Sequence, residues 1–208
     1  MRTKVYLVAA FMASSLSVNG SFKSANAIEK AKKTIFIAAA LRKGDNKAKP
    51  ALKIKIDNDV VMADDLMLKG KFGEAADAYH TATQKGKGKN IPATIGYGMA
   101  LAKQFKLEAA NEQFDKVLAL DPRNAMAHSG KAIVMFNRLQ SSSKTVIDQK
   151  SAILKGAEDE CKKGLALDPG MPEAHYTMGM IEKEQGRLDE AESEFAEATK
   201  IDPQYAEA

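Results

Sequence analysis

The stretch from Pro172 to Tyr205 constrains the fold more than any other part of the chain. It reads PEAHYTMGMIEKEQGRLDEAESEFAEATKIDPQY, and Gly186 divides it into two amphipathic halves. Its small and aromatic residues stand at spacings of twelve, four, three and five: Gly179, Ala191, Phe195, Ala198 and Pro203. Two short amphipathic helices cannot bury their apolar faces alone, so the pattern predicts a helix pair that stacks on neighbouring pairs.

Earlier parts of the chain carry the same pattern in three further registers. The register from Ile56 holds Ala75, Tyr79 and Ala82, the one from Ile91 holds Gly98, Ala110 and Phe114, and the one from Ala125 holds Ala132, Ala157 and Cys161. Pro122 and Pro169 each follow a Leu-Asp pair and end a second helix, because proline cannot continue one. The aromatic rings of Tyr79, Phe114 and Phe195 are expected to fill the space between successive pairs.

This layout resembles the tetratricopeptide repeat, a helix-turn-helix unit of about 34 residues with Ala-x3-Phe in its second helix and a closing proline. The resemblance implies an all-α solenoid of about four repeats, at residues 56–90, 91–124, 125–171 and 172–208. Aromatic residues make up only 6% of the chain and tryptophan is absent, which suits closely packed helices. Pro169 follows Pro122 by 47 residues, so the third repeat contains an insertion, centred on Gln140–Val146 and expected to form a surface loop.

The first 27 residues have the layout of a secretory signal peptide. A short basic start precedes an apolar run from Val5 to about Val18, and Ser24-Ala25-Asn26-Ala27 offers a cleavage site after Ala27. The alternative is an uncleaved membrane anchor, but the apolar run is short for a helix that spans about 30 Å of hydrocarbon. The sequence therefore predicts an exported protein, periplasmic or secreted, and favours a bacterial envelope.

Residues 28–55 form a basic leader, whereas the remainder of the chain is acidic. The leader contains nine positive and two negative residues, while residues 56–208 carry a net charge of −6. We expect the leader to be a cap on the first repeat or a linker; contact with an anionic membrane surface is the alternative. An acidic repeat array argues against nucleic acid as a partner.

No residue pattern points to catalysis, a metal or a cofactor. Cys161 occupies the aromatic position of its repeat, and His128 and His175 share one repeat position, so all three are interpreted as packing residues. The sequence has no glycine-rich phosphate loop and no metal-ligand spacing. The chain is therefore expected not to be an enzyme.

The resemblance also implies a binding surface, because the first helices of such repeats line a concave groove. The positions that usually face this groove are occupied here by Ile95, Met99, Lys103, Ser129, Ile133, Phe136, Asn137, Tyr176, Met180 and Glu184. Several are apolar, and methionine adapts readily to different partners. The leading hypothesis is an exported scaffold that binds partner proteins or peptides through this groove. Two alternatives stay open: a structural subunit that self-associates through its last repeat and basic leader, and an accessory domain of an enzyme.

Overall fold

The computed structural model describes residues 57–139, 146, 148–203 and 205. Within these ranges the chain forms α-helices joined by short turns, and no strand occurs there. The helices are α3 (Asn58–Leu68), α4 (Phe72–Lys85), α5 (Ile91–Lys103), α6 (Leu107–Leu120), α7 (Ala125–Arg138), α9 (Lys150–Leu167), α10 (Pro172–Glu184) and α11 (Leu188–Ile201). The expected signal peptide (1–27), the basic leader (28–55) and most of the expected insertion lie outside the described residues.

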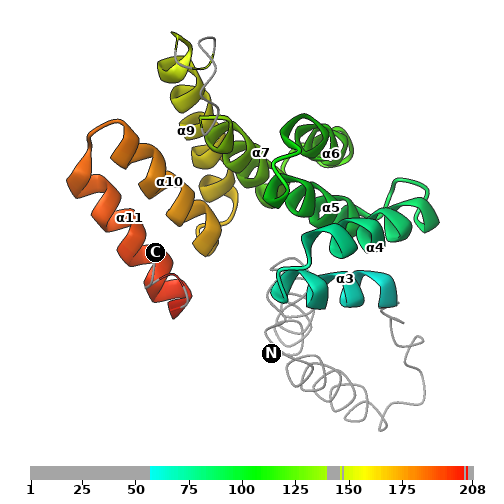
Figure 1. Ribbon diagram of the computed structural model, residues 1–208. Helices are drawn as coiled ribbons and strands as arrows, with labels where there is room; N and C mark the ends of the chain where they lie inside the picture. Colours follow the sequence, from blue (N-terminus) through cyan, green and yellow to red (C-terminus); the bar gives the residue numbers. More distant parts are fainter. Residues whose placement is uncertain (1–56, 140–145, 147, 204, 206–208) are drawn as a thin grey trace, which may run out of the picture.

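The helices pack as antiparallel pairs, and the pairs follow one another in an arc (Figure 1). The pairs are α3 with α4, α5 with α6, α7 with α9, and α10 with α11. The first helices also touch one another in chain order, α3 against α5, α5 against α7, and α7 against α10. This arrangement is the helical solenoid that the sequence predicts, and it places the four first helices in one continuous row.

Local sequence explains where the first helices begin. The side chains of Asp57, Asn90 and Asn124 accept hydrogen bonds from backbone N–H groups in the first turns of α3, α5 and α7. These N–H groups have no partner inside the helix, so an Asp or Asn side chain at this position stabilises the helix start. Pro172 instead opens α10, where its missing N–H is not needed.

In the first, second and fourth pairs, the turns between first and second helices share one backbone conformation. The φ angle is +70° at Gly70, +57° at Phe105 and +80° at Gly186, all in the left-handed region. Glycine adopts this region without strain, whereas a side chain there is unfavourable. The second pair therefore has a phenylalanine, Phe105, at the turn position where the first and fourth pairs have glycine.

Rings packed against glycine hold successive pairs together. The Phe114 side chain is fully buried, and a Cβ atom added at Gly98 or at Gly130 would lie 2.9 or 2.4 Å from its ring. Gly98 belongs to the same helix pair as Phe114, whereas Gly130 belongs to the next pair. The absence of two side chains thus lets one ring fill the space between α5, α6 and α7.

The same ring–glycine packing joins the first pair to the second, and it is incomplete at the last pair. Tyr79 is 3% exposed, and a Cβ atom at Gly96 of the following pair would lie 2.3 Å from its ring. Phe195 lies against Gly179 of its own pair but remains partly exposed, because no described helix pair lies beyond α11. The expectation of a ring between successive pairs is therefore met by Tyr79 and Phe114, and only in part by Phe195.

The third pair contains the longest helix of the described residues. Helix α9 has 18 residues, whereas α4, α6 and α11 have 14 each. This longer second helix follows the insertion along the chain. At its aromatic position Cys161 is fully buried, and its thiol donates a hydrogen bond of 3.1 Å to the Ala174 carbonyl oxygen.

Candidate partner-binding surface

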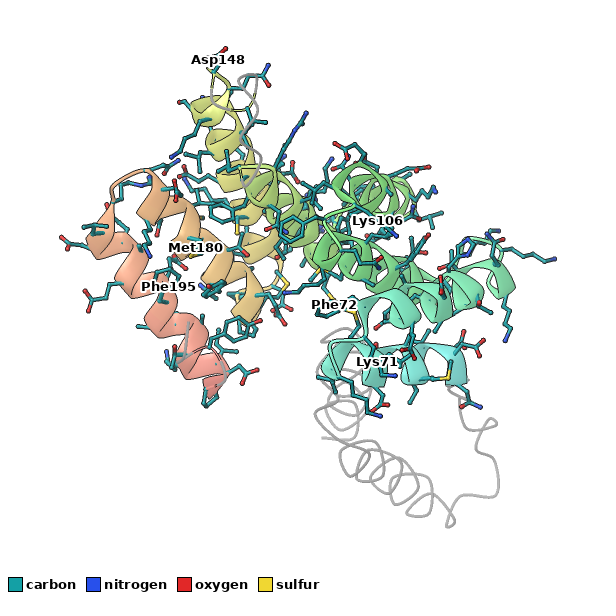
Figure 2. All side chains as sticks on the ribbon, viewed as in Figure 1. Lys71, Phe72, Lys106, Asp148, Met180 and Phe195 are labelled. Carbon is teal, nitrogen blue, oxygen red and sulfur yellow. The ribbon has the colours of Figure 1, made fainter. Side chains whose placement is uncertain are left out.

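The row of first helices presents apolar side chains that are only partly covered. Met99 on α5, Ile133 on α7 and Met180 on α10 occupy equivalent positions and are each half-buried (Figure 2 labels Met180). Because α5, α7 and α10 contact one another in this order, the three side chains belong to successive helices of one row. Apolar side chains that a fold leaves partly exposed along one row favour contact with another chain.

Two of the expected groove residues are instead part of the core. Ile95 is 6% exposed and packs in the cluster around Phe114, and Ser129 is 5% exposed. A Cβ atom at Gly164 of α9 would lie 3.3 Å from the Ser129 backbone nitrogen, so the close approach of α9 to α7 covers this residue. The structure therefore places Ile95 and Ser129 in the core, and the contact of the other expected groove residues with a partner stays a prediction.

Polar residues stand at the ends of the row. Lys103 and Glu184 are both exposed at the last turns of α5 and α10. Glu184 pairs with Lys150 Nζ at 2.7 Å, and both side chains are more than 40% exposed. An ion pair this exposed adds little stability, so a partner could compete for either charge.

Aromatic residues lie towards the other end of α10. The Tyr176 ring centroid is 5.5 Å from those of Phe195 and Tyr205, and both ring pairs are tilted. Burial raises the pKa of Tyr205, and the nearby Glu173 adds to this effect. Of the remaining expected residues, Phe136 packs partly on the core of the third and fourth pairs, and Asn137 is half-buried beside it in α7.

A buried hydrogen bond on the first pair was not foreseen. Tyr79 donates its hydroxyl hydrogen to the Asp64 carboxylate, which is half-buried on α3. Burial raises the pKa of Asp64, and the hydrogen bond from Tyr79 opposes this rise. The signal in the sequence was tyrosine in place of phenylalanine at this position, since a buried tyrosine hydroxyl needs a partner.

His128 links three segments rather than only packing against them. Its Nδ1 lies 2.7 Å from Oε2 of Glu160 on α9, and its Nε2 lies 3.2 Å from the carbonyl oxygen of Pro122. The ring thus joins α7 to its second helix and to the turn that closes the preceding pair. Burial raises the pKa of Glu160, but hydrogen bonds from His128 and Lys163 outweigh it and lower that pKa.

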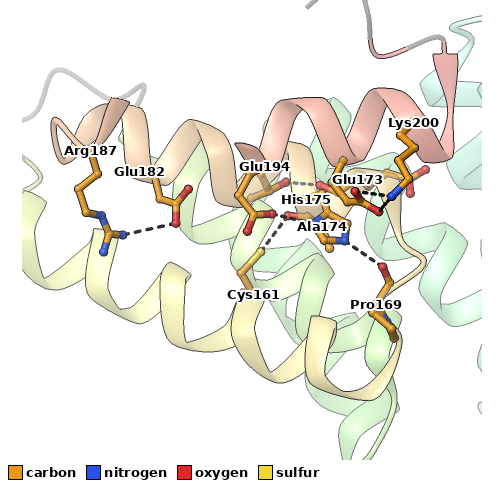
Figure 3. Close-up of polar contacts among 11 residues, drawn as sticks. Cys161, Pro169, Glu173, Ala174, His175, Glu182, Arg187, Glu194 and Lys200 are labelled. Carbon is orange, nitrogen blue, oxygen red and sulfur yellow. Dashed lines mark hydrogen bonds and ion pairs between the residues drawn. The ribbon is translucent and has the colours of Figure 1, made fainter. Parts of the chain in front are cut away.

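His175 repeats this arrangement in the last pair (Figure 3). Its Nδ1 is 2.6 Å from Glu194 Oε2 on α11, and its Nε2 is 2.9 Å from the Pro169 carbonyl oxygen. Both histidines are nearly buried, with side chains 14% and 12% exposed. Each histidine therefore connects its own helix pair to the turn that closes the preceding pair, which is a structural role.

A second polar cluster joins α9 to the turn before α11. Glu158 accepts hydrogen bonds from Lys162 at 2.6 Å and Gln185 at 3.1 Å, and pairs with Arg187 at 3.2 Å. These contacts lower the pKa of Glu158 to about 2, the bond from Lys162 contributing most. Glu182 Oε1 lies 3.9 Å from the same Arg187 nitrogen, Nη2, and burial raises the pKa of Glu182 (Figure 3).

Neither a metal nor a reactive thiol is indicated. Across residues 57–139 and 148–203, no group of three or more His, Cys, Asp or Glu side chains could hold a metal ion. Burial raises the pKa of the Cys161 thiol to about 12, so the thiolate form is disfavoured. Among the helices of the described chain, none is both long enough and apolar enough to cross a membrane.

Comparisons with known proteins agree with this geometry. Two family models, both described as tetratricopeptide repeat, match residues 60–125 and 154–208, together more than half of the 208 residues. No curated protein sequence matches the chain. A tetratricopeptide-repeat protein of Thermus thermophilus, TTC0263, is 16% identical with a TM-score of 0.62, covering 70% of this chain and 74% of that one.

A second solved structure shows the same fold over a longer stretch. MamA from Desulfovibrio magneticus RS-1 is 17% identical with a TM-score of 0.50, covering 85% of this chain and 86% of that one. At these identities the likeness concerns the fold alone. The two matching family models and the stacked helix pairs show that the chain belongs to the tetratricopeptide-repeat family.

Proposed function

We propose that this protein is an exported, non-enzymatic scaffold that binds a protein or peptide partner along the row of first helices. The observation that carries the proposal is the set of half-buried apolar residues Met99, Ile133 and Met180 on three helices that touch in order. A peptide laid across them would bury these side chains without rearranging the core. Phe136 and Tyr176 flank the row and would add aromatic contacts.

Export rests on the amino-terminal sequence and places the partner in the envelope or outside the cell. Mass spectrometry of the protein from fractionated cells tests it directly. An exported and processed chain begins at Ile28, whereas an intact Met1 in the cytoplasmic fraction would contradict export.

Affinity capture tests the binding row when it compares matched variants. Ile133→Lys and Met180→Lys place a positive charge on the row, whereas Asp77→Lys reverses the charge at an exposed position of α4. We expect the partner recovered by the wild-type chain and by Asp77→Lys to be lost with both row variants, provided that their helical circular dichroism is unchanged. A partner that both row variants retain would place the binding surface elsewhere.

A further inference from the structure

Phe105 combines two features that a repeat turn does not need. Its backbone lies in the left-handed region with φ of +57°, where the equivalent turns have Gly70 and Gly186. Its side chain is also 62% exposed, so packing inside the chain does not explain why phenylalanine occupies this strained position. A strained residue that gains nothing from its own fold points to a contact outside it.

The charges around Phe105 are free, unlike those of the equivalent turn in the first pair. There, Lys69 pairs with Asp65 at 2.5 Å and Lys71 pairs with Glu74 at 2.9 Å. Lys103 and Lys106 are exposed, and neither side-chain ammonium group has a hydrogen-bond or ion-pair partner among the described residues (Figure 2 labels Lys106). We call Lys103, Phe105 and Lys106 the turn patch: one exposed ring between two unpaired cations.

The start of α11 presents the complementary surface. Leu188 is 65% exposed, whereas the residues at the equivalent position of α4 and α6, Phe72 and Leu107, are partly buried. Glu192 lies one helical turn after Leu188 on the same face, and Asp189 lies at the edge of that face, three residues before Glu192. Both acidic residues are exposed, and neither carboxylate has a partner in the described part of the chain. We call Leu188, Asp189 and Glu192 the α11 patch.

We propose that the turn patch of one molecule binds the α11 patch of a second copy of this chain. The apolar side chains of Phe105 and Leu188 would meet while the lysines face the carboxylates, so that both exposed residues and all four unpaired charges gain partners. Because the two patches differ, the contact is heterologous, and each bound pair of copies still offers one free patch of each kind. The resulting assemblies grow with protein concentration and weaken in high salt, since the contact is small and partly ionic.

This inference does not rest on the binding row, and its test is separate. Sedimentation velocity of the protein as isolated, over a concentration series in low salt, should show a rising mean mass that falls in high salt. Lys106→Glu and Asp189→Lys should each weaken association at least about tenfold, because each places like charges opposite one another. The chain carrying both substitutions should associate again, and an equimolar mixture of the two single variants should also associate beyond dimers, because each variant meets opposite charges on the other at both of its patches.

A second variant separates the contact from folding. Phe105→Gly removes both the ring and the unfavourable backbone, so it should abolish association while the thermal midpoint stays unchanged or rises. The row variants Ile133→Lys and Met180→Lys should associate like the wild-type chain. A wild-type chain that stays monomeric in low salt, a double charge variant that does not recover, or a Phe105→Gly chain that still associates would overturn the proposal.

Discussion

Replacing Gly130 by alanine tests the ring–glycine packing that joins α5 and α6 to α7. Alanine favours a helix interior over glycine by about 1 kcal/mol, so propensity alone predicts a more stable protein. The added Cβ atom would, however, lie 2.4 Å from two ring atoms of Phe114, where carbon atoms normally stand about 3.5–4.0 Å apart. The ring has little room to retreat, because it also packs closely against Gly98, where an added Cβ atom would lie 2.9 Å from it.

The gain in helix propensity and the cost of overpacking oppose each other, so their relative sizes decide whether Gly130→Ala stabilises or destabilises the protein. Overpacking of a tight core costs about 1–3 kcal/mol, and a fully buried ring packed against two glycines belongs at the upper end. Less the gain of about 1 kcal/mol from propensity, Gly130→Ala should destabilise the protein by about 2 kcal/mol. With a typical urea slope of about 1–3 kcal/mol per molar, the urea midpoint should fall by about 1 M.

Urea unfolding followed by far-ultraviolet circular dichroism measures this shift. Gly73→Ala is the matched control, because Gly73 is an exposed helical glycine with no atom within 4 Å of an added Cβ. It should be neutral or stabilise by up to about 1 kcal/mol. In a double-mutant cycle, Phe114→Leu should cost less in the Gly130→Ala background than alone. A Gly130→Ala protein as stable as Gly73→Ala would refute the packing described here.

Three further predictions follow from burial and charge. Phe114→Ala should cost about 3–5 kcal/mol, whereas Phe195→Ala should cost clearly less because its ring is partly exposed; chemical unfolding of both compares them. The bonds from Lys162 and its neighbours lower the pKa of Glu158 from 4.5 to about 2, so the stability it contributes is present above pH 4.5 and lost as the pH falls towards 2. Urea midpoints across this range should therefore fall less steeply in Glu158→Gln than in the wild-type chain. Cys161 should react with a thiol reagent only as fast as the protein opens, because the thiol is fully buried and its pKa is about 12; fast labelling of the native protein would contradict this.

The fold could be predicted from the sequence because the repeat pattern encodes the helix pair directly. Glycine at the turn, alanine and an aromatic ring on the second helix, and a closing proline determine where helices end and which faces meet. Tyr79 and Phe114 were thus identified as buried rings from their spacing alone. The pattern assumes a following pair for every ring, which is why Phe195 is less buried than expected.

The candidate surface was harder to predict, because a repeat position indicates a direction but not a distance. Ile95 and Ser129 occupy positions that usually face a groove, yet close helix approach covers both. How near α9 comes to Ser129 depends on Gly164, which lies far along the chain, and sequence spacing cannot measure that approach. The positive φ angle of Phe105 could not be predicted either, because it is visible only in the three-dimensional structure.

The ring–glycine packing also limits how such a protein can evolve. Phe114 needs Gly130 in the helix pair that follows it, whereas the pair after Cys161 has the buried Thr177 at the position that corresponds to Gly130. Joining the last pair directly to the second would set Thr177 against the Phe114 ring, where not even one methyl group fits. These units are therefore not interchangeable modules: duplication, deletion or shuffling of one pair succeeds only when its neighbour changes in step.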